Sequence, residues 1–252
     1  MKNNRIVSQQ EWLEARKQLL QKEKEFTRLR DELSAQRRQL PWVKVDKSYV
    51  FEGPRGRQSL ADLFEGRSQL MTYHFMFGPG WKEGCPSCSF LADHIDGALI
   101  HLQHRDVKLM AVSRAPYSQI AAFKQRMGWK FDWQSSNGSD FNYDYQASHT
   151  PSAISSNTAV YNYGALEFPM EETHGLSVFY KDDSGQIFHT YSSYARGCDM
   201  FVGAYNYLDL APKGRDEEAL EFTMAWVRHH DRYDGYQLDA KAGYHIPEAV
   251  ES

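Results

Sequence analysis

Two cysteines separated by two residues are the side chains of this sequence best suited to chemistry. Cys85 and Cys88 stand in the stretch Gly-Cys-Pro-Ser-Cys. Such a pair can close a small disulfide and reopen it by thiol exchange. The thiolate is the attacking species, and the unpaired N–H groups at the start of a helix stabilise it. The spacing therefore predicts Cys85 as the nucleophile and Cys88, one helical turn further on, as the resolving thiol.

The residues around the pair fit the start of a helix. Pro86 suits the first helical turn, because the N–H that proline lacks has no partner there. Lys82 could add positive charge near the first sulfur, whereas Glu83 would oppose it, so the sequence gives no net direction. Trp81 follows a Gly-Pro-Gly loop, and we expect it to cover the cysteine pair, since loop aromatics beside a site often contact its ligand.

Zinc binding and inert thiols are the alternatives to a redox pair. A structural zinc site needs two more ligands, typically from a second close pair. Cys198 is single, and His94, His101 and His104 fall on one expected helix, which makes a tetrahedral set awkward. A strand, a breaker, the Cys-x-x-Cys motif and a helix follow one another here, which favours a redox pair. We therefore expect no metal and no cofactor, and Cys198 as a buried bystander.

The elements that must position the pair alternate between strand and helix. Residues 69–77 are aromatic and apolar and run into Gly78-Pro79-Gly80, which predicts a buried strand closed by breakers. Helical spacing over 89–102, a second apolar strand over 107–112 and a helix over 117–127 follow. This order predicts an α/β fold with parallel strands joined by right-handed crossovers. His74, inside the first strand, should be a packed and hydrogen-bonded histidine.

A long helix is predicted before this core. Ser8 and Glu11 form a capping-box pattern, and Pro41 supplies a stop. Apolar residues recur between them every seven positions, at Trp12, Leu19, Phe26, Leu33 and Leu40. A face of this kind fits a helix laid across its own domain, and it fits equally an arm that packs on a second subunit. The second possibility predicts a homodimer.

The remaining segments predict additions around the core. Residues 129–170 are polar yet rich in aromatic residues, which predicts an ordered insertion rather than a linker. Hairpins are expected near 49–56 and over 176–191, and a closing helix over 216–230 should turn Leu220, Met224 and Val227 inward. The organisation that follows has three parts: an N-terminal arm (1–45), a domain containing the insertion (46–235) and a C-terminal tail (236–252).

Composition excludes several classes of function. The chain has 252 residues, a net charge of -4 and three cysteines. It lacks the basic excess expected of a strong nucleic-acid binder, and three cysteines cannot build a disulfide scaffold. No run of 18 apolar residues predicts a membrane span, and the polar N-terminal stretch lacks a signal-peptide core. We expect a cytoplasmic protein that binds neither nucleic acid nor membranes.

Several segments together resemble a known family. They are HFMFGPGW, GCPSCSFLADHIDG, AVSRAP, RMGW, YNYLDL, KGRDE and the YARG of residues 194–197. The sequence resembles, over nearly its whole length, the bacterial domain-of-unknown-function 899 family, whose members are thioredoxin-like and predicted to be dithiol-disulfide oxidoreductases. The resemblance implies a thioredoxin or peroxiredoxin-like three-layer fold with a mixed central sheet. It aligns Cys85 and Cys88 with the redox cysteines of that fold.

Two departures from thioredoxin bear on the expected activity. Thioredoxin's motif is Trp-Cys-Gly-Pro-Cys, whereas here Gly84 precedes the first cysteine and Pro86 follows it directly. The two residues between the cysteines help to set the redox potential, so the direction of the reaction, reduction or oxidation of the substrate, stays open. Thioredoxins also carry a cis-proline before the strand that follows the insertion. The corresponding stretch has Thr173, His174 and Gly175 and no proline. We expect these three residues to flank the cysteines.

Peroxide reduction is the nearest alternative to disulfide exchange. Peroxiredoxins place a proline seven residues and a threonine or serine three residues before the reactive cysteine, whereas Gly78 and Lys82 hold those positions before Cys85. A peroxidase would also need an arginine near the sulfur, and Arg114 or Arg196 could supply it. A binding or assembly protein on the same fold is a further alternative. The leading hypothesis is an oxidoreductase whose partners are a disulfide-containing substrate, of protein or small-molecule type, and a thiol reductant.

Overall fold

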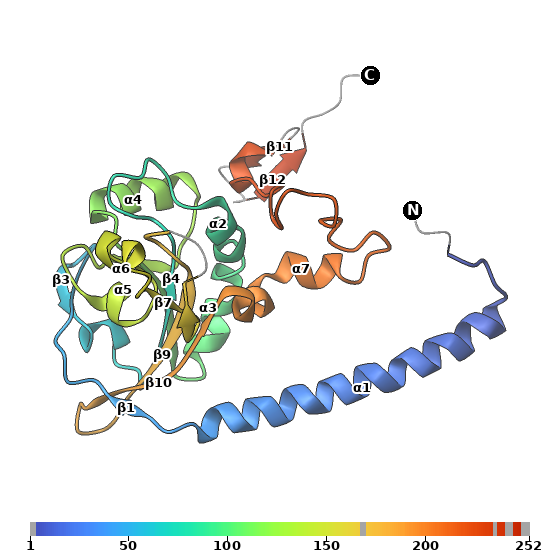
Figure 1. The fold of residues 1–252 in the computed structure, drawn as a ribbon, viewed down its shortest axis with the longest axis horizontal. Helices are drawn as coiled ribbons and strands as arrows, with labels where there is room; N and C mark the ends of the chain where they lie inside the picture. The colour runs from blue at the N-terminus through green and yellow to red at the C-terminus, as the bar shows by residue number, and fades with distance from the viewer. Residues whose placement is uncertain (1–3, 167–169, 234–235, 240–243, 248–252) are drawn as a thin grey trace. The chain divides into compact units, whose positions relative to one another are not determined.

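The computed structural model describes residues 4–166, 170–233, 236–239 and 244–247. The chain divides into two compact units, residues 1–42 and residues 43–252, and each is described by itself. Figure 1 shows the course of the chain. No helix of the described ranges is both long enough and apolar enough to cross a membrane.

The first unit is a single helix, α1 (Gln9–Gln39). The predicted capping box is present, because Ser8 Oγ accepts from the Glu11 N–H and the Glu11 carboxylate accepts from the Ser8 N–H. No residue of α1 is buried. The five heptad residues, Leu40 included, expose between 44% and 66% of their surface. The predicted helix is confirmed.

The second unit is built on a mixed sheet. Its strand order among the described residues is β1-β10-β9-β4-β5-β6-β2-β3. The strands are β1 (Val43–Lys44), β2 (Val50–Gly53), β3 (Gly56–Ser59), β4 (Gln69–His74), β5 (Val107–Ser113), β6 (Asp132–Ser135), β9 (Gly175–Lys181) and β10 (Ile187–Tyr194). β4, β5 and β6 pair in parallel, whereas β9 and β10 form an antiparallel hairpin that joins the other edge of β4. The predicted strands and both hairpins are confirmed.

Helices cover both faces of this sheet. They are α2 (Pro86–Ala92), α3 (Asp96–Gln103), α4 (Tyr117–Arg126), α5 (Phe141–Asp144), α6 (Pro151–Ser155) and α7 (Gly203–Leu208), with 3-10 turns η1 (Asp62–Phe64), η2 (Ala195–Phe201) and η3 (His230–Arg232). In Figure 1, α2 and α3 lie on one side of the sheet and α5 and α6 on the other. This is a three-layer thioredoxin-like arrangement, as the resemblance implied.

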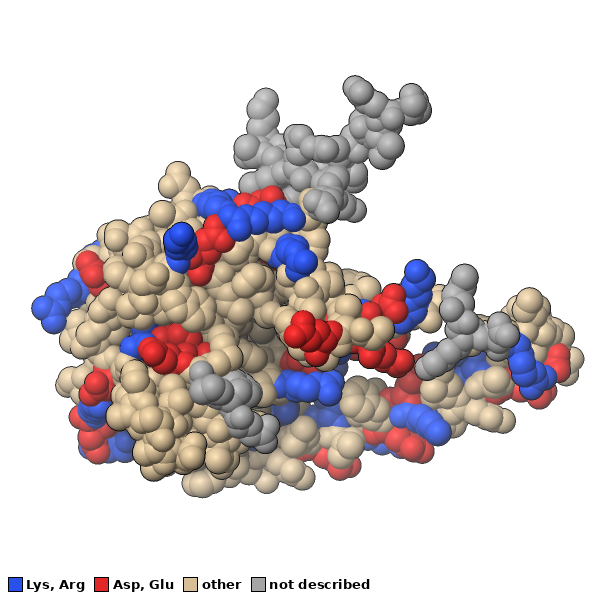
Figure 2. All heavy atoms as spheres, turned by 45° about the horizontal axis from the view of Figure 1, so that its top comes forward, with Lys and Arg blue, Asp and Glu red and all other residues tan. Residues whose placement is uncertain are grey.

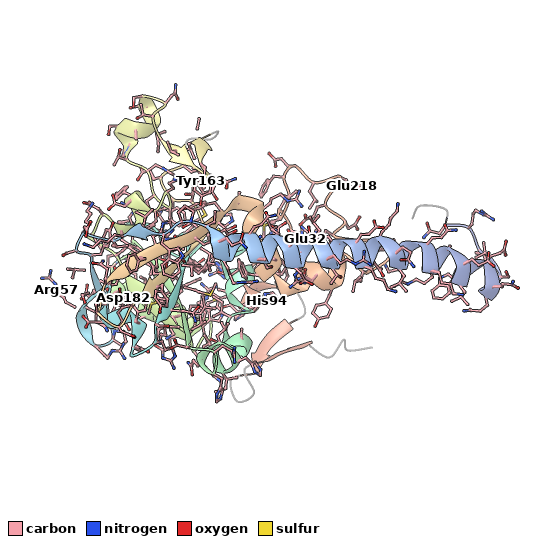
Figure 3. The ribbon with its side chains drawn as sticks, turned by 90° about the horizontal axis from the view of Figure 1, so that it is seen from below. Glu32, Arg57, His94, Tyr163, Asp182 and Glu218 are labelled. Atoms are coloured by element: carbon pink, nitrogen blue, oxygen red, sulfur yellow. The ribbon has the colours of Figure 1, made fainter. Side chains whose placement is uncertain are left out.

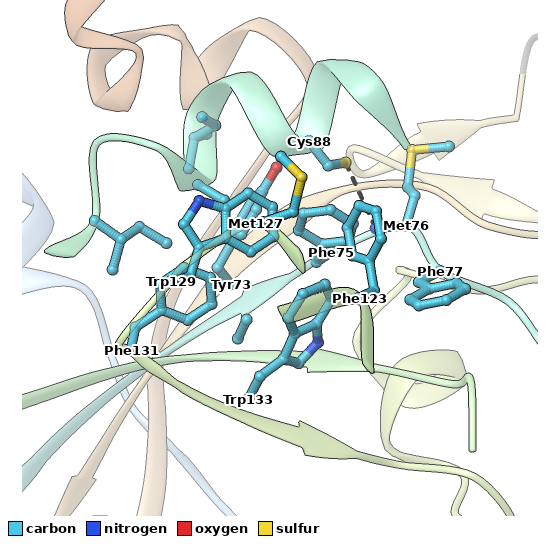
Figure 4. Close-up of a cluster of buried hydrophobic side chains, with 14 of the residues drawn as sticks. Tyr73, Phe75, Met76, Phe77, Cys88, Phe123, Met127, Trp129, Phe131 and Trp133 are labelled. Atoms are coloured by element: carbon cyan, nitrogen blue, oxygen red, sulfur yellow. Dashed lines mark hydrogen bonds between the residues drawn. The ribbon is translucent and has the colours of Figure 1, made fainter. Parts of the chain in front are cut away.

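Alternation along the strands produces one core on each face of the sheet. Tyr73 and Ala111 turn toward the first core, which α2, α3 and α4 cover, whereas Leu70 and Met110 turn toward the second, which η1 and α5 cover. Both cores are largely aromatic. The rings of the first include Phe75, Phe77, Phe123, Trp129, Phe131 and Trp133, shown in Figure 4.

The helix expected over 89–102 is two helices. The chain turns at residues 93–95, between α2 and α3. Asp93 Oδ1 accepts from the Trp129 indole (2.7 Å), and the Asp96 carboxylate accepts from the N–H groups of Lys130 and Phe131 (2.8 Å each). The two aspartates therefore hold the segment that leads into β6, in addition to any effect on a helix dipole.

The aromatic segment 129–170 is ordered where it is described. Its first part forms β6 and extends the sheet, and α5 places Phe141 in the second core, fully buried. α6 and the small hairpin of β7 (Val160–Tyr161) and β8 (Gly164–Ala165) follow. Tyr163, labelled in Figure 3, lies in the turn of this hairpin and donates to the Ser192 carbonyl of β10 (2.9 Å). The segment therefore packs on its own domain.

The closing helix predicted over 216–230 is wrong. Residues 209–229 run as turns and loop, and only η3 (His230–Arg232) follows. The Glu217 carboxylate accepts from the Trp226 indole (2.6 Å) and from the Met224 N–H (3.1 Å), which folds the segment back on itself. Val227 is buried as predicted, whereas Leu220 is exposed. These contacts of Glu217 stand where the apolar spacing predicts a helix. Beyond it, β11 (Tyr236–Asp239) pairs with β12 (Tyr244–Pro247).

Candidate active site at Cys85 and Cys88

Cys85 occupies the position immediately before α2. Its backbone is extended, its N–H donates to the Met76 carbonyl at the end of β4 (3.0 Å), and its carbonyl accepts from the Ser89 N–H (2.9 Å). Pro86 is the first residue of the helix, as predicted. The strand end and the helix start therefore fix the first sulfur at the edge of the sheet, where it is half-buried.

Gly84 is required by close packing rather than by an unusual backbone angle. A Cβ added there would lie 2.6 Å from the Phe75 ring and 2.8 Å from the Phe123 ring. The tryptophan that precedes the first cysteine in thioredoxin has no room at this position. The two aromatic rings of the first core thus leave room only for glycine directly before Cys85.

Hydrogen bonds lower the pKa of the Cys85 thiol to about 7. The largest contribution is a hydrogen bond with the Cys88 thiol. The backbone N–H groups of Cys88 and Ser87 and the Ser87 hydroxyl add to it, against burial. The thiolate of Cys85 is therefore well populated near neutral pH, as a nucleophile requires.

Cys88 has the opposite character. It is 2% exposed and belongs to the first core. Burial raises its pKa well above the usual range, and the neighbouring Cys85 sulfur raises it further. Two donors oppose this: the Tyr73 hydroxyl and the Met76 N–H, whose nitrogen lies 3.5 Å from the sulfur. Figure 4 shows Cys88 on α2 above the aromatic core, with its bond to Met76.

Tyr73 reaches this sulfur from β4. Its side chain is 1% exposed, and burial raises the pKa of its hydroxyl, as does the hydrogen bond with Cys88. The hydroxyl therefore keeps its proton and acts as a donor. His74, the next residue, turns to the other face, where its Nε2 bonds the Ser177 hydroxyl (2.9 Å) and burial lowers its pKa to about 3. It is the packed, neutral histidine that the sequence predicted.

A cavity of about 300 Å³ opens over Cys85. Trp81, Gly84 and Pro86 line it from the segment that the sequence singled out. Arg228, His229 and Arg232, together with Glu83, complete the wall. The C-terminal segment of the domain therefore forms one side of the cavity, more than 140 residues along the chain from the cysteines.

His229 ties that segment to the cysteine loop. Its Nε2 donates to the Gly84 carbonyl (2.8 Å), because Arg126 Nη2 donates to its Nδ1 (3.0 Å) and so fixes the proton on Nε2. The imidazole is 4% exposed, and burial lowers its pKa. A neutral His229 therefore holds the peptide that precedes the nucleophile.

Ion pairs surround this contact. Arg126 pairs with Asp231 through two bonds (2.7 and 2.9 Å) and with Glu83 (2.8 Å), and Arg232 also pairs with Glu83 (2.8 Å). These pairs hold η3 against the loop before α2. On the visible face of Figure 2, basic and acidic atoms are interspersed in the same manner.

The other residues expected at the site are placed in different surroundings. Lys82 is exposed. The Arg196 side chain is 89% exposed, pairs with Asp199 (3.3 Å) and does not line the cavity. Arg114 donates to the Glu172 carboxylate (2.8 Å) and lies in a second cavity of about 370 Å³ that shares Trp81.

Thr173, His174 and Gly175 lead into β9, beside the end of β4. Gly175 stands opposite His74 in the sheet, the Thr173 hydroxyl donates to the Gln146 carbonyl (3.1 Å), and His174 Nε2 bonds the Ala195 carbonyl (3.2 Å). A Cβ at Gly175 would lie 2.4 Å from the Tyr194 ring. These contacts join the start of β9 to β4, to the insertion and to η2. None of the three residues lines the cavity over Cys85.

Sequence reasoning missed His229, Arg228 and Tyr73. His229 and His230 fall at the end of the helix predicted over 216–230, whereas in the structure His229 is buried in a loop and His230 Nδ1 bonds Asp93 (2.5 Å). The density of titratable residues in the stretch 228–232 was the available signal. Tyr73 could have been found from strand alternation, since it lies on the face of β4 that α2 covers.

The third cysteine, Cys198, lies apart from the cavity over Cys85. Cys198 is 2% exposed, and burial raises the pKa of its thiol to about 12. It is a protonated thiol whose Sγ lies 3.5 Å from the Ser193 carbonyl. Within the described ranges, no group of three or more His, Cys, Asp or Glu residues is arranged to hold a metal ion.

Solved structures similar to this chain include several peroxiredoxins. PrxQ of Xylella fastidiosa, as a cysteine-to-serine variant, aligns with a TM-score of 0.40 and 10% identity, covering 63% of this chain and 88% of its own. Peroxiredoxin Q of Xanthomonas campestris aligns with a TM-score of 0.40 and 13% identity, covering 63% of this chain and 90% of its own. Peroxidoxin BcpB of Mycobacterium tuberculosis aligns with a TM-score of 0.38 and 13% identity, covering 65% of this chain and 93% of its own. No curated protein matches the sequence.

The sequence itself matches one family. Residues 1–233 match the family described as "Bacterial protein of unknown function (DUF899)", which confirms the resemblance drawn from the motifs. The matched range contains the long helix, the cysteine pair and the segment that carries His229. This chain is a member of the DUF899 family.

Proposed function

We propose that this protein is a thiol-disulfide oxidoreductase that uses Cys85 and Cys88. One observation carries the proposal. Cys85 stands immediately before α2 on the wall of a cavity, and Cys88 is buried one helical turn further on. Their pKa values shift in opposite directions, to about 7 for Cys85 and upward for Cys88. A nucleophile with a pKa near the ambient pH combines a useful thiolate fraction with strong nucleophilicity.

In the first step, the Cys85 thiolate attacks one sulfur of a substrate disulfide in the cavity. A bond forms between Cys85 Sγ and that sulfur, the substrate S–S bond breaks, and the first half leaves as a thiolate that takes a proton from water. The N–H groups of Ser87 and Cys88 stabilise the attacking charge. Trp81 and Pro86 line the cavity and offer apolar surface to the substrate beside the sulfur.

In the second step, Cys88 must lose its proton and attack Cys85 Sγ. The Cys85–Cys88 disulfide then forms, the bond between Cys85 Sγ and the second half of the substrate breaks, and that half leaves as a thiolate that takes up the proton released by Cys88. The Tyr73 hydroxyl and the Met76 N–H donate to the Cys88 sulfur and stabilise the thiolate there. Once Cys85 is bound in the mixed disulfide, its charge no longer opposes that ionisation. An external thiol reductant then returns both cysteines to the reduced state.

Intact-mass analysis of a single turnover tests this proposal. Reduced protein mixed with excess bis(2-hydroxyethyl) disulfide should lose the mass of two hydrogens while two thiols are released. Cys85→Ser should abolish the reaction. Cys198→Ser is the matched control, since it removes the buried bystander, and it should react at the rate of the natural chain. If Cys85→Ser still reduces the disulfide at an unchanged rate, the proposal is wrong.

Two other functions, peroxide reduction and binding, make different predictions. A peroxide reductase would oxidise rapidly with hydrogen peroxide and slowly with the disulfide. A binding or assembly protein on this fold would keep its biological activity in a Cys85→Ser/Cys88→Ser double variant. The disulfide reaction with loss of activity in the double variant is the outcome that we expect.

The homodimer expected from the heptad face of α1 stays a prediction. The open apolar residues of α1 support it, because a face of this size normally packs on something. Light scattering should give a mass of twice the chain, and a mass near 29.2 kDa at micromolar concentration would contradict it.

A further inference from the structure

Three arginines stand near the Cys85 cavity, and two of them already have carboxylate partners. Arg126 pairs with Asp231 and Glu83, and Arg232 pairs with Glu83. Arg228 differs. Its Nη1 donates to the carbonyls of Ala225 (2.9 Å) and Val227 (3.0 Å), and in the described part of the chain no carboxylate lies within ion-pair distance of it.

The two carbonyl bonds fix the guanidinium of Arg228 without neutralising it. Both bonds use one nitrogen, so the remaining N–H groups of the guanidinium keep the planar donor geometry that suits a carboxylate. The Arg228 N–H also bonds the Tyr233 hydroxyl (3.1 Å), which ties down the backbone that carries the side chain. Arg228 is therefore a held, exposed cation on the wall of the cavity that contains Cys85.

The charge balance of the wall points in the same direction. Arg228 and Arg232 line the cavity against a single acid, Glu83, and that acid is shared between Arg232 and Arg126. A thiolate at Cys85 repels an anionic substrate, so a cation a short distance away selects substrates whose negative charge lies beside their disulfide. A cavity of about 300 Å³ is of the size that holds a small molecule.

We propose that the cavity takes low-molecular-weight disulfides that carry a carboxylate, with Arg228 binding the carboxylate while Cys85 attacks the nearer sulfur. The inference rests on the proposed function and names its substrate class. Atoms and electrons balance as in ordinary exchange: the substrate disulfide is reduced to two thiols, and Cys85 and Cys88 are oxidised to a disulfide. Arg228 itself takes no part in the covalent steps.

Three disulfides of similar length and different charge test the proposal. They are 3,3′-dithiodipropionate with two carboxylates, bis(2-hydroxyethyl) disulfide without charge, and cystamine with two ammonium groups. The second-order rate constant of the reduced full chain is measured for each at about pH 8, where Cys85 is ionised, and at low salt. Each variant is compared with the natural chain on the same disulfide, which cancels differences in leaving-group pKa.

Arg228→Gln should lower the rate constant for dithiodipropionate by about 10-fold. It should leave the rate constant for the neutral disulfide within about 2-fold and raise the rate constant for cystamine by a few-fold. The loss should shrink in about 0.5 M salt. Arg196→Gln is the matched control, because Arg196 is an exposed arginine outside the cavity, and it should change none of the three. Arg228→Lys should recover part of the preference for the dianion, since it restores the charge without the fork.

An equal change on all three disulfides would overturn the inference, because charge recognition must distinguish them. No change with Arg228→Gln would overturn it as well. If the natural chain reduces the neutral disulfide, the proposed function holds whichever way Arg228 behaves. If the natural chain reacts with none of the three, the proposed function fails and the inference fails with it. Unchanged melting temperatures of the variants exclude misfolding as the cause.

Discussion

The two ends of the first turn of α2 have opposite surroundings. Around Cys85 the chain is polar and half-open, with the ion pairs of Glu83, Arg126 and Arg232 beside it and backbone donors facing the sulfur. Around Cys88 the chain is closed and aromatic, and the Tyr73 hydroxyl lies beside the sulfur. Identical side chains therefore differ in pKa, in access and in role.

This difference teaches how one short motif can supply two chemistries. Cys85 lies before the helix, where N–H groups have no helical partner, whereas Cys88 lies on the face that packs on the sheet. The rate of the first step depends on access and thiolate fraction. The rate of the second depends on how well a buried sulfur can be ionised. Changes on the two sides should therefore separate the two steps.

The largest effect should come from replacing each of the two cysteines, Cys85 and Cys88, by serine in turn. Cys88→Ser should keep the first step and stop the second, so that a mixed disulfide between Cys85 and half of the substrate accumulates. Cys85→Ser should form no adduct. Intact mass spectrometry after mixing with bis(2-hydroxyethyl) disulfide distinguishes the two. An adduct on Cys85→Ser, with none on Cys88→Ser, would reverse the assignment of roles.

The pH dependence of alkylation should separate the two sulfurs next. Since the pKa of Cys85 is lowered to about 7, its thiolate fraction and its rate with iodoacetamide should rise between about pH 6 and 8 and then level off. The raised pKa of Cys88 predicts no reaction over this range in the folded chain. Mass mapping of the labelled peptides measures both, and a plateau reached only above about pH 9 would contradict the hydrogen-bonded thiolate.

Removing the Tyr73 hydroxyl should slow only the second step. Tyr73→Phe keeps the ring in the core and removes a donor to Cys88, so resolution of the mixed disulfide should slow by about 10-fold while its formation stays within about 2-fold. Tyr205→Phe is the control, since Tyr205 lies in the same core with its hydroxyl on Glu217. Rapid-quench mass spectrometry follows both steps. Equal slowing of both would show that Tyr73 acts through packing alone.

The smallest effect should come from the contact between His229 and Gly84. His229→Ala leaves the buried Gly84 carbonyl without its donor and should cost about 1–3 kcal/mol of unfolding free energy, whereas His229→Gln should recover part of it. The lowered pKa of His229 adds stability that is complete above about pH 6.5 and is lost as pH falls through the folded pKa. Urea unfolding at several pH values measures both. Stability of His229→Ala that matches the natural chain would refute this role.

The motif and the central strands could be predicted from sequence because their signals are local. Breakers, apolar runs and the Cys-x-x-Cys spacing fix β4, β5 and the start of α2 without reference to distant residues. The segment 209–233 could not be predicted in this way. Its loop depends on Glu217 meeting Trp226, and its role depends on His229 reaching Gly84, 145 residues away in the chain. Polar contacts of this kind do not follow the spacing of a helix or a strand, so they leave little pattern in the sequence.

The contacts of Thr173, His174 and Gly175 could not be predicted from the sequence either. In the structure these residues join β9 to the insertion. Arg196 points to solvent instead of toward the sulfurs. The arginines that line the cavity over Cys85 come from η3 and from the loop before it, where the sequence predicts a closing helix.

The reduction potential of the Cys85/Cys88 couple tests the central claim most directly. The full chain is equilibrated in buffers of graded dithiothreitol ratio, quenched, and analysed by intact mass and peptide mapping. We predict one reversible two-electron transition in which the oxidised chain has lost two hydrogens and carries the disulfide between Cys85 and Cys88. A chain that stays reduced across the series, or a disulfide that maps to Cys198, would contradict the account.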